Sequence, residues 1–335
     1  LSFFVNAGIR FVTEMCKMRA FVDLWDEILL QRYGVEDPKF RRFRYGVQVN
    51  SLGLTEQQPE NNVYRILVEM LAVTLSKKAR ARAVQLPAWN EALGLPRPWD
   101  QQWSMRMQQI MAFETDLLEY EDLFDGNQVV DAKVESLKAS ARYELETIET
   151  QGGALNAIEY MKSRLVESNT DRLQNIESNH TTVVGVNKFT NTEKSPLVSG
   201  DGGIMVVDPS VEKDQIDRLN LWRRKRDEKL VSKALFNLRK AALEDQNIMP
   251  TSIEAAKAGA TTGEWAQEMR NIYGEYRGPT GVAIGISNKT DGLDELRSAV
   301  DAVSDKLGER LKFLIGKPGL DGHSNGAEQI ASRAR

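Results

Sequence analysis

The sequence has very few of the side chains that form disulfides and metal sites. Its 335 residues include one cysteine, Cys16, and two histidines, His180 and His323. One cysteine excludes an intrachain disulfide framework and fits a reducing cytosol. Three thiol and imidazole groups are also too few for a Cys/His zinc site. Any metal chemistry must therefore use carboxylates, or a metal that arrives inside a cofactor.

Long apolar runs and an excess of positive charge are missing as well. No stretch is long enough to span a bilayer, and there is no signal peptide. The formal net charge is −4, so no global positive field attracts nucleic acid or anionic membrane. The basic run Arg223–Arg226 is flanked by acids and is expected to form a solvated helix face. We therefore expect a cytoplasmic protein with no nucleic-acid or membrane partner.

Strand and helix patterns alternate over the first hundred residues. Apolar spacing predicts a helix up to about Trp25 after a short strand-like start. Two strand patterns follow, at 43–50 and 80–86, with a helical pattern at 60–76 between them. A short helix is predicted at 90–94. This alternation favours an α/β fold with parallel strands, of which the βα barrel is one main form.

The rest of the chain is predicted to be mainly helical. A capping box is expected at the beginning of one helix, with Thr251 or Ser252 at the cap and Glu254 behind it. The predicted helices are 99–167 with breaks at 125–126 and 151–153, 211–246, 251–275, 293–307 and 326–335. Strands are predicted at 182–189 and 311–315, and the polar, glycine-rich stretch 192–208 is predicted to be a loop.

A short motif near the C-terminus carries the clearest chemical signal. Asp321-x-His323-x-x-Gly326 stands between a predicted strand and a predicted helix, and ligands of open α/β sheets bind at such strand ends. His323 could face a flat cofactor while Asp321 accepts its other ring N–H. Gly322 and Gly326 allow the backbone to approach a bulky group. The alternative is a solvated histidine in an ordinary turn; Lys317 favours the cofactor interpretation.

The stretch Lys317-Pro-Gly-Leu-Asp-Gly-His323 resembles the lower-ligand loop of the adenosylcobalamin-dependent acyl-CoA mutases, the methylmalonyl-CoA mutase family. The resemblance implies that His323 ligates the cobalt of adenosylcobalamin. Asp321 and Lys317 would support it through hydrogen bonds, with Gly322 and Gly326 beside the cofactor.

Upstream segments resemble the second half of the same family's catalytic barrel and its tail, in the right order. Region 44–103 is similar to the ethylmalonyl-CoA mutase branch. The segments that carry the wider resemblance are Leu1–Phe4, Glu14–Ala20, Leu54–Gln57 with Asn61–Asn62, Asn90–Pro96 and Val184–Lys188.

The resemblance implies an α/β fold in four parts. Residues 1–125 would be the C-terminal half of a TIM-type (β/α)8 barrel, and 126–195 a helical tail. A linker region would span 196–308. The last part, 309–335, would be the truncated start of a flavodoxin-like (Rossmann-type) cobalamin-binding domain. Since both ends also interrupt a pattern, we expect a fragment that is inactive alone and binds cobalamin weakly.

Site residues follow by position from the same resemblance. The family's catalytic Tyr-His region would precede Leu1. Ser2 and Arg82 would contact the acyl-CoA substrate. The residues expected at the cofactor are Gln48, Ser51 (where the family has glycine), Glu91 and Gly94. Three of the site residues have a plain structural alternative: Ser2 as a helix cap, Glu91 as a solvated acid at a helix start, and Arg82, with Arg80, in an ion pair at the barrel mouth.

Two departures from the methylmalonyl-CoA mutases bear on the substrate. Gly46 stands where those enzymes have histidine, and Pro87 where they have asparagine. A missing side chain at Gly46 would leave room for an additional methylene. We therefore expect the isomerisation of ethylmalonyl-CoA to methylsuccinyl-CoA.

The alternatives are methylmalonyl-CoA mutase and a corrinoid-binding methyl carrier or accessory protein without mutase activity. The barrel-like residues 1–125 favour a mutase, since a simple carrier would not need them. The implied partners are an acyl-CoA substrate, a second copy in a homodimer and, as a further candidate, a G-protein chaperone.

Overall fold

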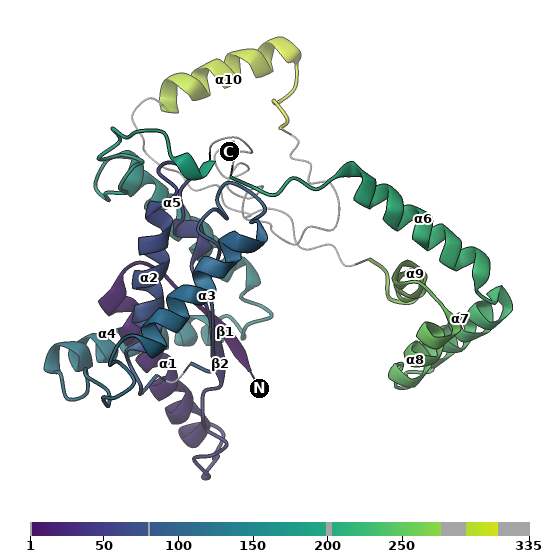
Figure 1. The fold of residues 1–335 in the computed structure, drawn as a ribbon, viewed down its shortest axis with the longest axis horizontal. Coiled ribbons are helices and arrows are strands. Elements are labelled where there is room, and N and C mark those ends of the chain that lie inside the picture. Colours follow the sequence, from purple (N-terminus) through teal and green to yellow (C-terminus); the bar gives the residue numbers. More distant parts are fainter. Residues whose placement is uncertain (1, 80, 199–202, 276–292, 314–335) are drawn as a thin grey trace. The chain divides into compact units, whose positions relative to one another are not determined.

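The computed structural model describes residues 2–79, 81–198, 203–275 and 293–313 (Figure 1). They form two compact units. The first carries the β-sheet with its helices, and the second is Val206–Gly281.

The sheet of the first unit has three parallel strands in the order β1-β2-β3. The strands are β1 (Phe3–Ala7), β2 (Tyr45–Val49) and β3 (Ala83–Gln85). The chain crosses from one strand to the next through α1 (Phe11–Gln31) and then α2 (Asn61–Thr74). The predicted α/β class with parallel strands is confirmed. Closure into a barrel and a cobalamin-binding domain remain predictions.

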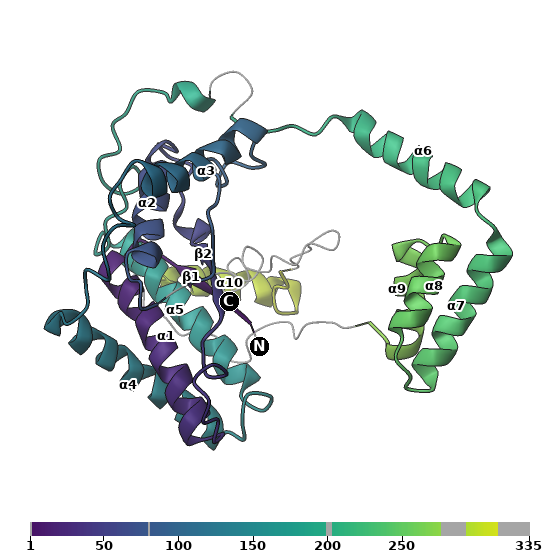
Figure 2. The ribbon, with the colours of Figure 1, turned by 60° about the horizontal axis from the view of Figure 1, so that its bottom comes forward.

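Helices α1 and α2 pack on one face of the sheet (Figures 1 and 2). Val47 and Val49 of β2 are fully buried on that face, in contact with apolar side chains of both helices. On the opposite face, the register aligns Asn6 with Gln48, and Gln48 with Gln85. All three of these side chains are exposed. We call this second face the uncovered face; its polar row is unusual for a parallel sheet, which is normally buried on both sides.

Four further described helices belong to the first unit, three of them before residue 205, together with two short 3-10 turns. Helix α4 begins where the Asn127 side chain accepts hydrogen bonds from the N–H groups of Val129 and Val130. It packs along α1 through a buried cluster that includes Cys16, a free and buried cysteine. The elements are α3 (Pro98–Phe113), α4 (Gln128–Thr150), α5 (Ile158–Glu177), η1 (Ser51–Gly53) and η2 (Pro196–Val198).

Two predicted elements of this unit are wrong. The stretch 90–94 forms turns and not a helix, because Gly94 has a φ of +150° and the Asn90 side chain is bound to Asp100. The predicted strand 182–189 is a tight turn with a single bridge between Val184 and Lys188. There Gly185 has a φ of +83°, a backbone conformation that ends an extended strand.

The second unit is a helical unit in which two predicted long helices are each divided. Asp227 accepts hydrogen bonds from the N–H groups of Lys229 and Leu230 and so begins a new helix. Gly259, with a φ of +98°, ends another. The capping box lies at Thr261 and Glu264, and not at the predicted Thr251 or Ser252. The helices are α6 (Pro209–Lys225), α7 (Glu228–Leu243), α8 (Met249–Ala258) and α9 (Thr262–Tyr273).

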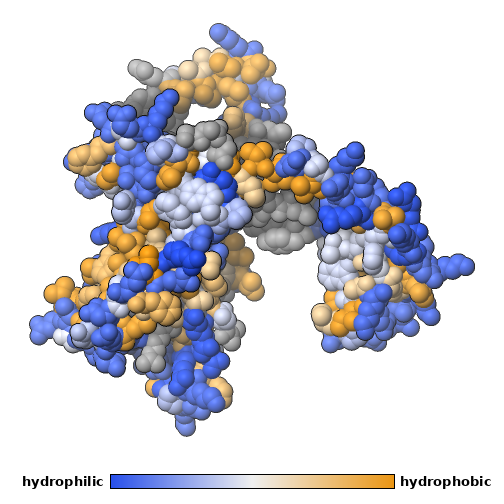
Figure 3. All heavy atoms as spheres, viewed as in Figure 1, coloured by the Kyte–Doolittle hydropathy of each residue, from blue (hydrophilic) through white to orange (hydrophobic). Residues whose placement is uncertain are grey.

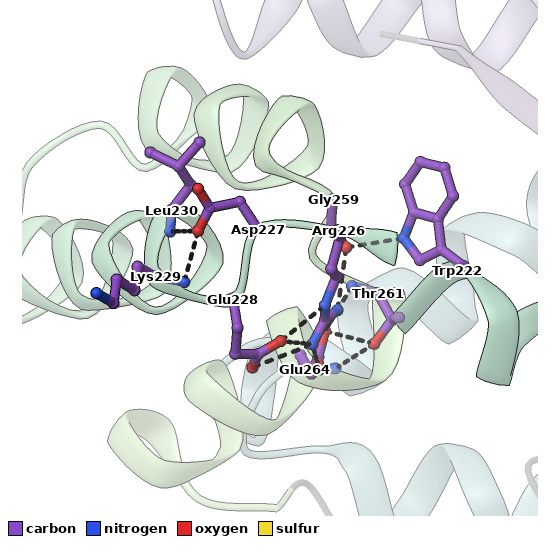
Figure 4. A network of polar contacts seen from close by, with 9 residues as sticks. All are labelled: Trp222, Arg226, Asp227, Glu228, Lys229, Leu230, Gly259, Thr261 and Glu264. Carbon is purple, nitrogen blue, oxygen red and sulfur yellow. Dashed lines mark hydrogen bonds and ion pairs between the residues drawn. The ribbon is translucent and has the colours of Figure 1, made fainter. Parts of the chain in front are cut away.

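Arg226 joins the helix ends of this unit (Figure 4). Its guanidinium donates to the carbonyl of Gly259 at 3.0 Å and to both carboxylate oxygens of Glu264 at 2.6 and 2.7 Å. It also pairs with Glu228. The side chain of Arg226 is only 6% exposed. The expectation of a solvated helix face is therefore wrong for the last residue of the basic run.

The predicted helix 293–307 is observed as α10 (Leu293–Leu307). Residues 311–313 are not a strand, and the rest of the strand predicted there, like the helix 326–335, lies outside the described residues. Among the helices of the described ranges, none is long and apolar enough to cross a membrane. Hydrophobic side chains nevertheless reach the surface of the first unit (Figure 3), as Phe4, Ile110 and Phe113 do.

The Arg226–Glu264 pair gives a prediction for the stability of the second unit. Hydrogen bonds from Arg226, and then those from Thr261, hold the pKa of Glu264 at about 2, below its ordinary 4.5. A depressed carboxylate pKa stabilises the fold above pH 4.5, and this contribution is lost as the pH falls toward 2. Glu264→Gln should lower the opening free energy of α8 and α9 by about 1–2 kcal/mol at neutral pH.

Hydrogen exchange of α8 and α9 in the whole chain measures this energy, and the gap to wild type should shrink as the pH falls below 4.5. Glu268→Gln is the matched control, since its partner Arg239 is 47% exposed. That change should cost no more than about 0.5 kcal/mol. Equal losses in the two variants would contradict the role assigned to Arg226.

Candidate functional site

The loops that follow the three strands meet at the carboxyl edge of the sheet, as parallel strands require. The N–H of Asn50 donates to the carbonyl of Ala7 at 2.8 Å, which joins the loop after β2 to the end of β1. Asn62 joins the loop after β2 to the loop after β3. We call this edge the rim; it consists of residues 8–10, 50–55 and 86–94.

The four described residues expected at the cofactor lie at or near the rim. Gln48 projects from β2 on the uncovered face, two residues before the rim. Ser51 begins η1. Glu91 is exposed in the turn after β3, where its N–H donates to the carbonyl of Ala88. Gly94 lies in the same turn, and a side chain there would place its Cβ 3.3 Å from Ile204.

The two residues expected at the substrate lie at the opposite edge. Ser2 precedes β1, and Arg82 precedes β3, where its N–H donates to the carbonyl of Tyr45 at 2.8 Å. At about 3.3 Å per strand residue, this edge is roughly 15 Å from the rim. Arg82 forms no ion pair with any residue that the structure describes, and its neighbour Arg80 lies outside those residues. The structure therefore separates the substrate candidates from the cofactor candidates.

Asn62, at the beginning of α2, is the central hydrogen-bonding group of the rim. Its side chain is fully buried. The amide nitrogen donates to the carbonyls of Thr55 and Trp89, both at 2.9 Å. The amide oxygen accepts from the Thr55 N–H at 3.0 Å and from Arg65 at 2.8 Å. One amide therefore fixes two loops that carry candidate cofactor residues.

Asp100, the third residue of α3, fixes the turn after β3 by hydrogen bonds to Trp89 and Asn90. It is fully buried and accepts hydrogen bonds from the Trp89 indole at 3.0 Å and the Asn90 amide at 2.8 Å. Arg97 adds its N–H at 2.8 Å and its guanidinium at 3.0 Å. Burial would raise the pKa of Asp100, but these hydrogen bonds outweigh it and hold the pKa below its usual value. The turn bearing Glu91 thus rests on an ionised carboxylate.

The helical tail contacts the rim from outside. Arg172 of α5 donates to the carbonyl of Leu52 at 3.3 Å. Gln58 donates to the carbonyl of Phe189 at 2.8 Å, and Arg65 to that of Val184 at 2.8 Å. The loop that bears Ser51 is therefore held between α2 and the tail.

Gly46 faces the ring of Phe4 on the uncovered face. A side chain at Gly46 would place its Cβ 2.8 Å from Cε2 and 2.9 Å from Cζ of Phe4, closer than atoms can approach. The Phe4 side chain is otherwise 65% exposed. The room expected beside Gly46 is thus occupied by a ring that has space to move.

The motif residues Lys317, Asp321, Gly322, His323 and Gly326 lie outside the described residues. Within the described ranges, no three His, Cys, Asp or Glu side chains converge to hold a metal ion. The rim itself offers amide, hydroxyl and carboxylate groups, which suit hydrogen bonding to the polar periphery of a large cofactor. The described residues therefore fit the polar edge of a large cofactor and not a bare metal ion.

Sequence reasoning missed the two groups that position the rim. Asn62 was noted only as part of a resemblance, and Asp100 was not noted at all. A signal for Asp100 existed, because an acid at the third position of a helix that begins with Arg97-Pro98 commonly bonds the N–H of the capping residue. Asn62 has no such signal, since its partners come from distant loops.

Comparison with known proteins gives a family and several curated relatives. The family model described as methylmalonyl-CoA mutase matches residues 1–275. The chain is 72% identical over 335 residues to the ethylmalonyl-CoA mutase of Cereibacter sphaeroides, covering 100% of the chain and 51% of that protein. For the ethylmalonyl-CoA mutase of Methylorubrum extorquens, the identity is 63%, with 100% and 49% covered.

The methylmalonyl-CoA mutase of Escherichia coli is 30% identical, with 99% of the chain and 47% of that protein covered. The chain therefore spans about half the length of the curated relatives it matches.

Asn62→Ala tests the rim. The change leaves the half-buried N–H and carbonyl of Thr55 and the buried carbonyl of Trp89 without their partner, so we expect the free energy of unfolding to fall by about 2–4 kcal/mol. Urea denaturation followed by circular dichroism measures it. The control is the neighbour Asn61, whose side chain bonds that of Gln58 and no other residue that the structure describes, and Asn61→Ala should cost less than about 1 kcal/mol. Similar losses would contradict the central role of Asn62.

Proposed function

Because the chain belongs to the methylmalonyl-CoA mutase family, we propose that it is part of an adenosylcobalamin-dependent isomerase of a branched dicarboxylic acyl-CoA. The proposed reaction converts ethylmalonyl-CoA to methylsuccinyl-CoA. The observation that carries the proposal is the identity of 72% and 63% to two ethylmalonyl-CoA mutases over the whole chain. Identity to the methylmalonyl-CoA mutases is only about 30%.

The rim supports binding of the cofactor. We propose that Glu91 and Gln48 hydrogen-bond its polar periphery, and that Ser51 and Gly94 lie beside it. His323 would ligate cobalt, supported by Lys317 and Asp321, with Gly322 and Gly326 beside it. When bound, adenosylcobalamin supplies the radical chemistry.

The remaining tasks fall to the chain's own residues. The uncovered face offers amides in a row, Asn6, Gln48 and Gln85, to orient a polar substrate along β2. The Phe4 ring beside them offers an apolar wall that helps to exclude water. The separation of Ser2 and Arg82 from the rim suits an extended thioester along the uncovered face, whose acyl part would lie beside Gly46 and the amide row and whose CoA part would lie toward the edge that carries Ser2 and Arg82. Arg82 is suited to a phosphate or a carboxylate.

Three wider properties belong to the same proposal. We propose a homodimer in the cytosol, with a G-protein chaperone as a further candidate partner. The single cysteine supports a reducing compartment.

The proposal is tested with a protein of the length of the curated relatives that contains this chain. Purified protein with adenosylcobalamin should isomerise ethylmalonyl-CoA, followed by mass spectrometry of the acyl-CoA products. His323→Ala should reduce this activity by about 100-fold or more, because loss of a mere supporting residue of a metal ligand already costs roughly 10–100-fold. Methyl transfer with methylcobalamin and a methyl donor, without isomerisation, would instead establish the carrier function.

Substrate preference is tested at Gly46. Gly46→His should displace the Phe4 ring into the space for the additional methylene, and so shift the ratio of kcat/KM for ethylmalonyl-CoA over methylmalonyl-CoA downward by about 10-fold or more. Phe4→Leu in the Gly46→His background removes the collision and separates misfolding from specificity. An unchanged ratio in both variants would refute the assignment of Gly46.

A further inference from the structure

Glu69 of α2 is a buried acid with no obvious structural purpose. It is 1% exposed, and its Oε2 accepts no hydrogen bond from any residue that the structure describes. Its helix neighbours Ile66, Met70 and Val73 are buried apolar residues. Burial, and then the charge of Glu14 on α1, raise the pKa of Glu69 to about 8. Glu69 is therefore protonated at neutral pH.

Glu14 and Glu69 lie close to the loops of the rim, on the face of the sheet that α1 and α2 cover. A Cβ added at Gly53 would lie 3.7 Å from Oε1 of Glu69 and 4.0 Å from the amide nitrogen of Asn50. A Cβ at Gly8 would lie 3.8 Å from that same nitrogen and 3.8 Å from Oε1 of Glu14. Glu14 thus lies under the loop after β1, and Glu69 lies under the loop after β2.

The cations near Glu14 and Glu69 form their hydrogen bonds and ion pairs with groups other than Glu69. Lys17 of α1 pairs with Glu14 at 2.5 Å and donates to the carbonyl of Asn6 at 2.7 Å. Arg65, on the same helix as Glu69, donates to Asn62 and to loop residues, and its charge lowers the pKa of Glu69 less than Glu14 raises it.

The other packed elements add little charge. Strand β1 and loop 50–54 have no titratable side chain, and β2 has only Tyr45, whose hydroxyl donates to the carbonyl of Ala79.

We propose that Glu69 is a positioning residue that holds loop 50–54 at the rim while it is protonated, and that its ionisation releases the loop. A carboxylate at this position would be a second negative charge beside Glu14, buried and without a donor for Oε2, so movement of the loop that admits water would relieve it. The inference rests on the proposed function in one respect, namely that this loop bears Ser51. The pH window follows from the sign of the shift: a carboxyl pKa raised from 4.5 to about 8 favours the held loop fully below pH 4.5, and this contribution is lost progressively as the pH rises from 4.5 to about 8.

The test uses the 335-residue chain without cofactor or substrate. Amide hydrogen exchange, corrected for intrinsic rates, gives protection factors for Asn50, Leu52 and Leu54 between about pH 6.5 and 9.5. In wild type these factors should fall by about 10-fold or more as the pH rises from 6.5 to 8, and they should level off near pH 8. Glu69→Gln keeps the size of the side chain and cannot ionise, so its protection should persist to the highest pH. Glu56→Gln, at an exposed acid near the same loop, should behave as wild type.

A second variant keeps the proposal testable if Glu69→Gln does not fold. Glu14→Gln removes the neighbouring charge, so protection should level off at a lower pH. Protection that is independent of pH in wild type, the same loss in Glu69→Gln, or a levelling-off pH that rises in Glu14→Gln would each overturn the proposal. Since hydrogen exchange does not depend on isomerisation, a negative enzyme assay would not contradict this inference. A negative hydrogen-exchange result would likewise not contradict the proposed function.

Discussion

The parallel register of three short strands is the constraint on which the candidate site depends. Because β1, β2 and β3 run in the same direction, the loops after them come to one edge, and side chains distant in sequence become neighbours. The register also aligns Asn6, Gln48 and Gln85 across the uncovered face. A slip of one residue would turn this amide row toward α1 and α2 and bring Val47 out of the core.

Register alone does not fix the loops, and two buried polar groups do so. Asn62 is an amide that donates and accepts, so it can bind the N–H and the carbonyl of one residue, Thr55, and a carbonyl of another loop. Asp100 only accepts, and it gathers donors from the turn after β3 and from Arg97. A rim built in this way is rigid where it meets α2 and α3, while Glu91 remains exposed above it.

The sequence predicts elements well where periodicity is strong and poorly where side chains decide. The strands around β2 and helix α2 follow from apolar spacing, and α10 agrees with its prediction to the residue. The breaks at Asp227 and Gly259 were missed because both lie within long helical patterns, where a cap or a left-handed glycine outweighs periodicity. For the site, the resemblance predicted four cofactor residues, which the structure brings to or near the rim. The two residues that hold the rim loops, Asn62 and Asp100, act through contacts between distant segments. No pattern within a window of sequence contains such contacts.

The two faces of β2 have different relations to the rim, and this difference separates two kinds of control. On the uncovered face, Gly46 and Phe4 determine how much volume is available beside the amide row, so a change there alters the shape offered to an acyl group. On the covered face, the strand packs against α1 and α2, which carry Glu14 and Glu69; the charge state of Glu69 acts on the loop after the strand and not on that volume. The shape of the acyl pocket and the protonation of Glu69 therefore act through opposite faces of one strand. Substitutions at Gly46 should alter substrate preference with little effect on the pH dependence of loop protection, and substitutions at Glu69 should do the reverse.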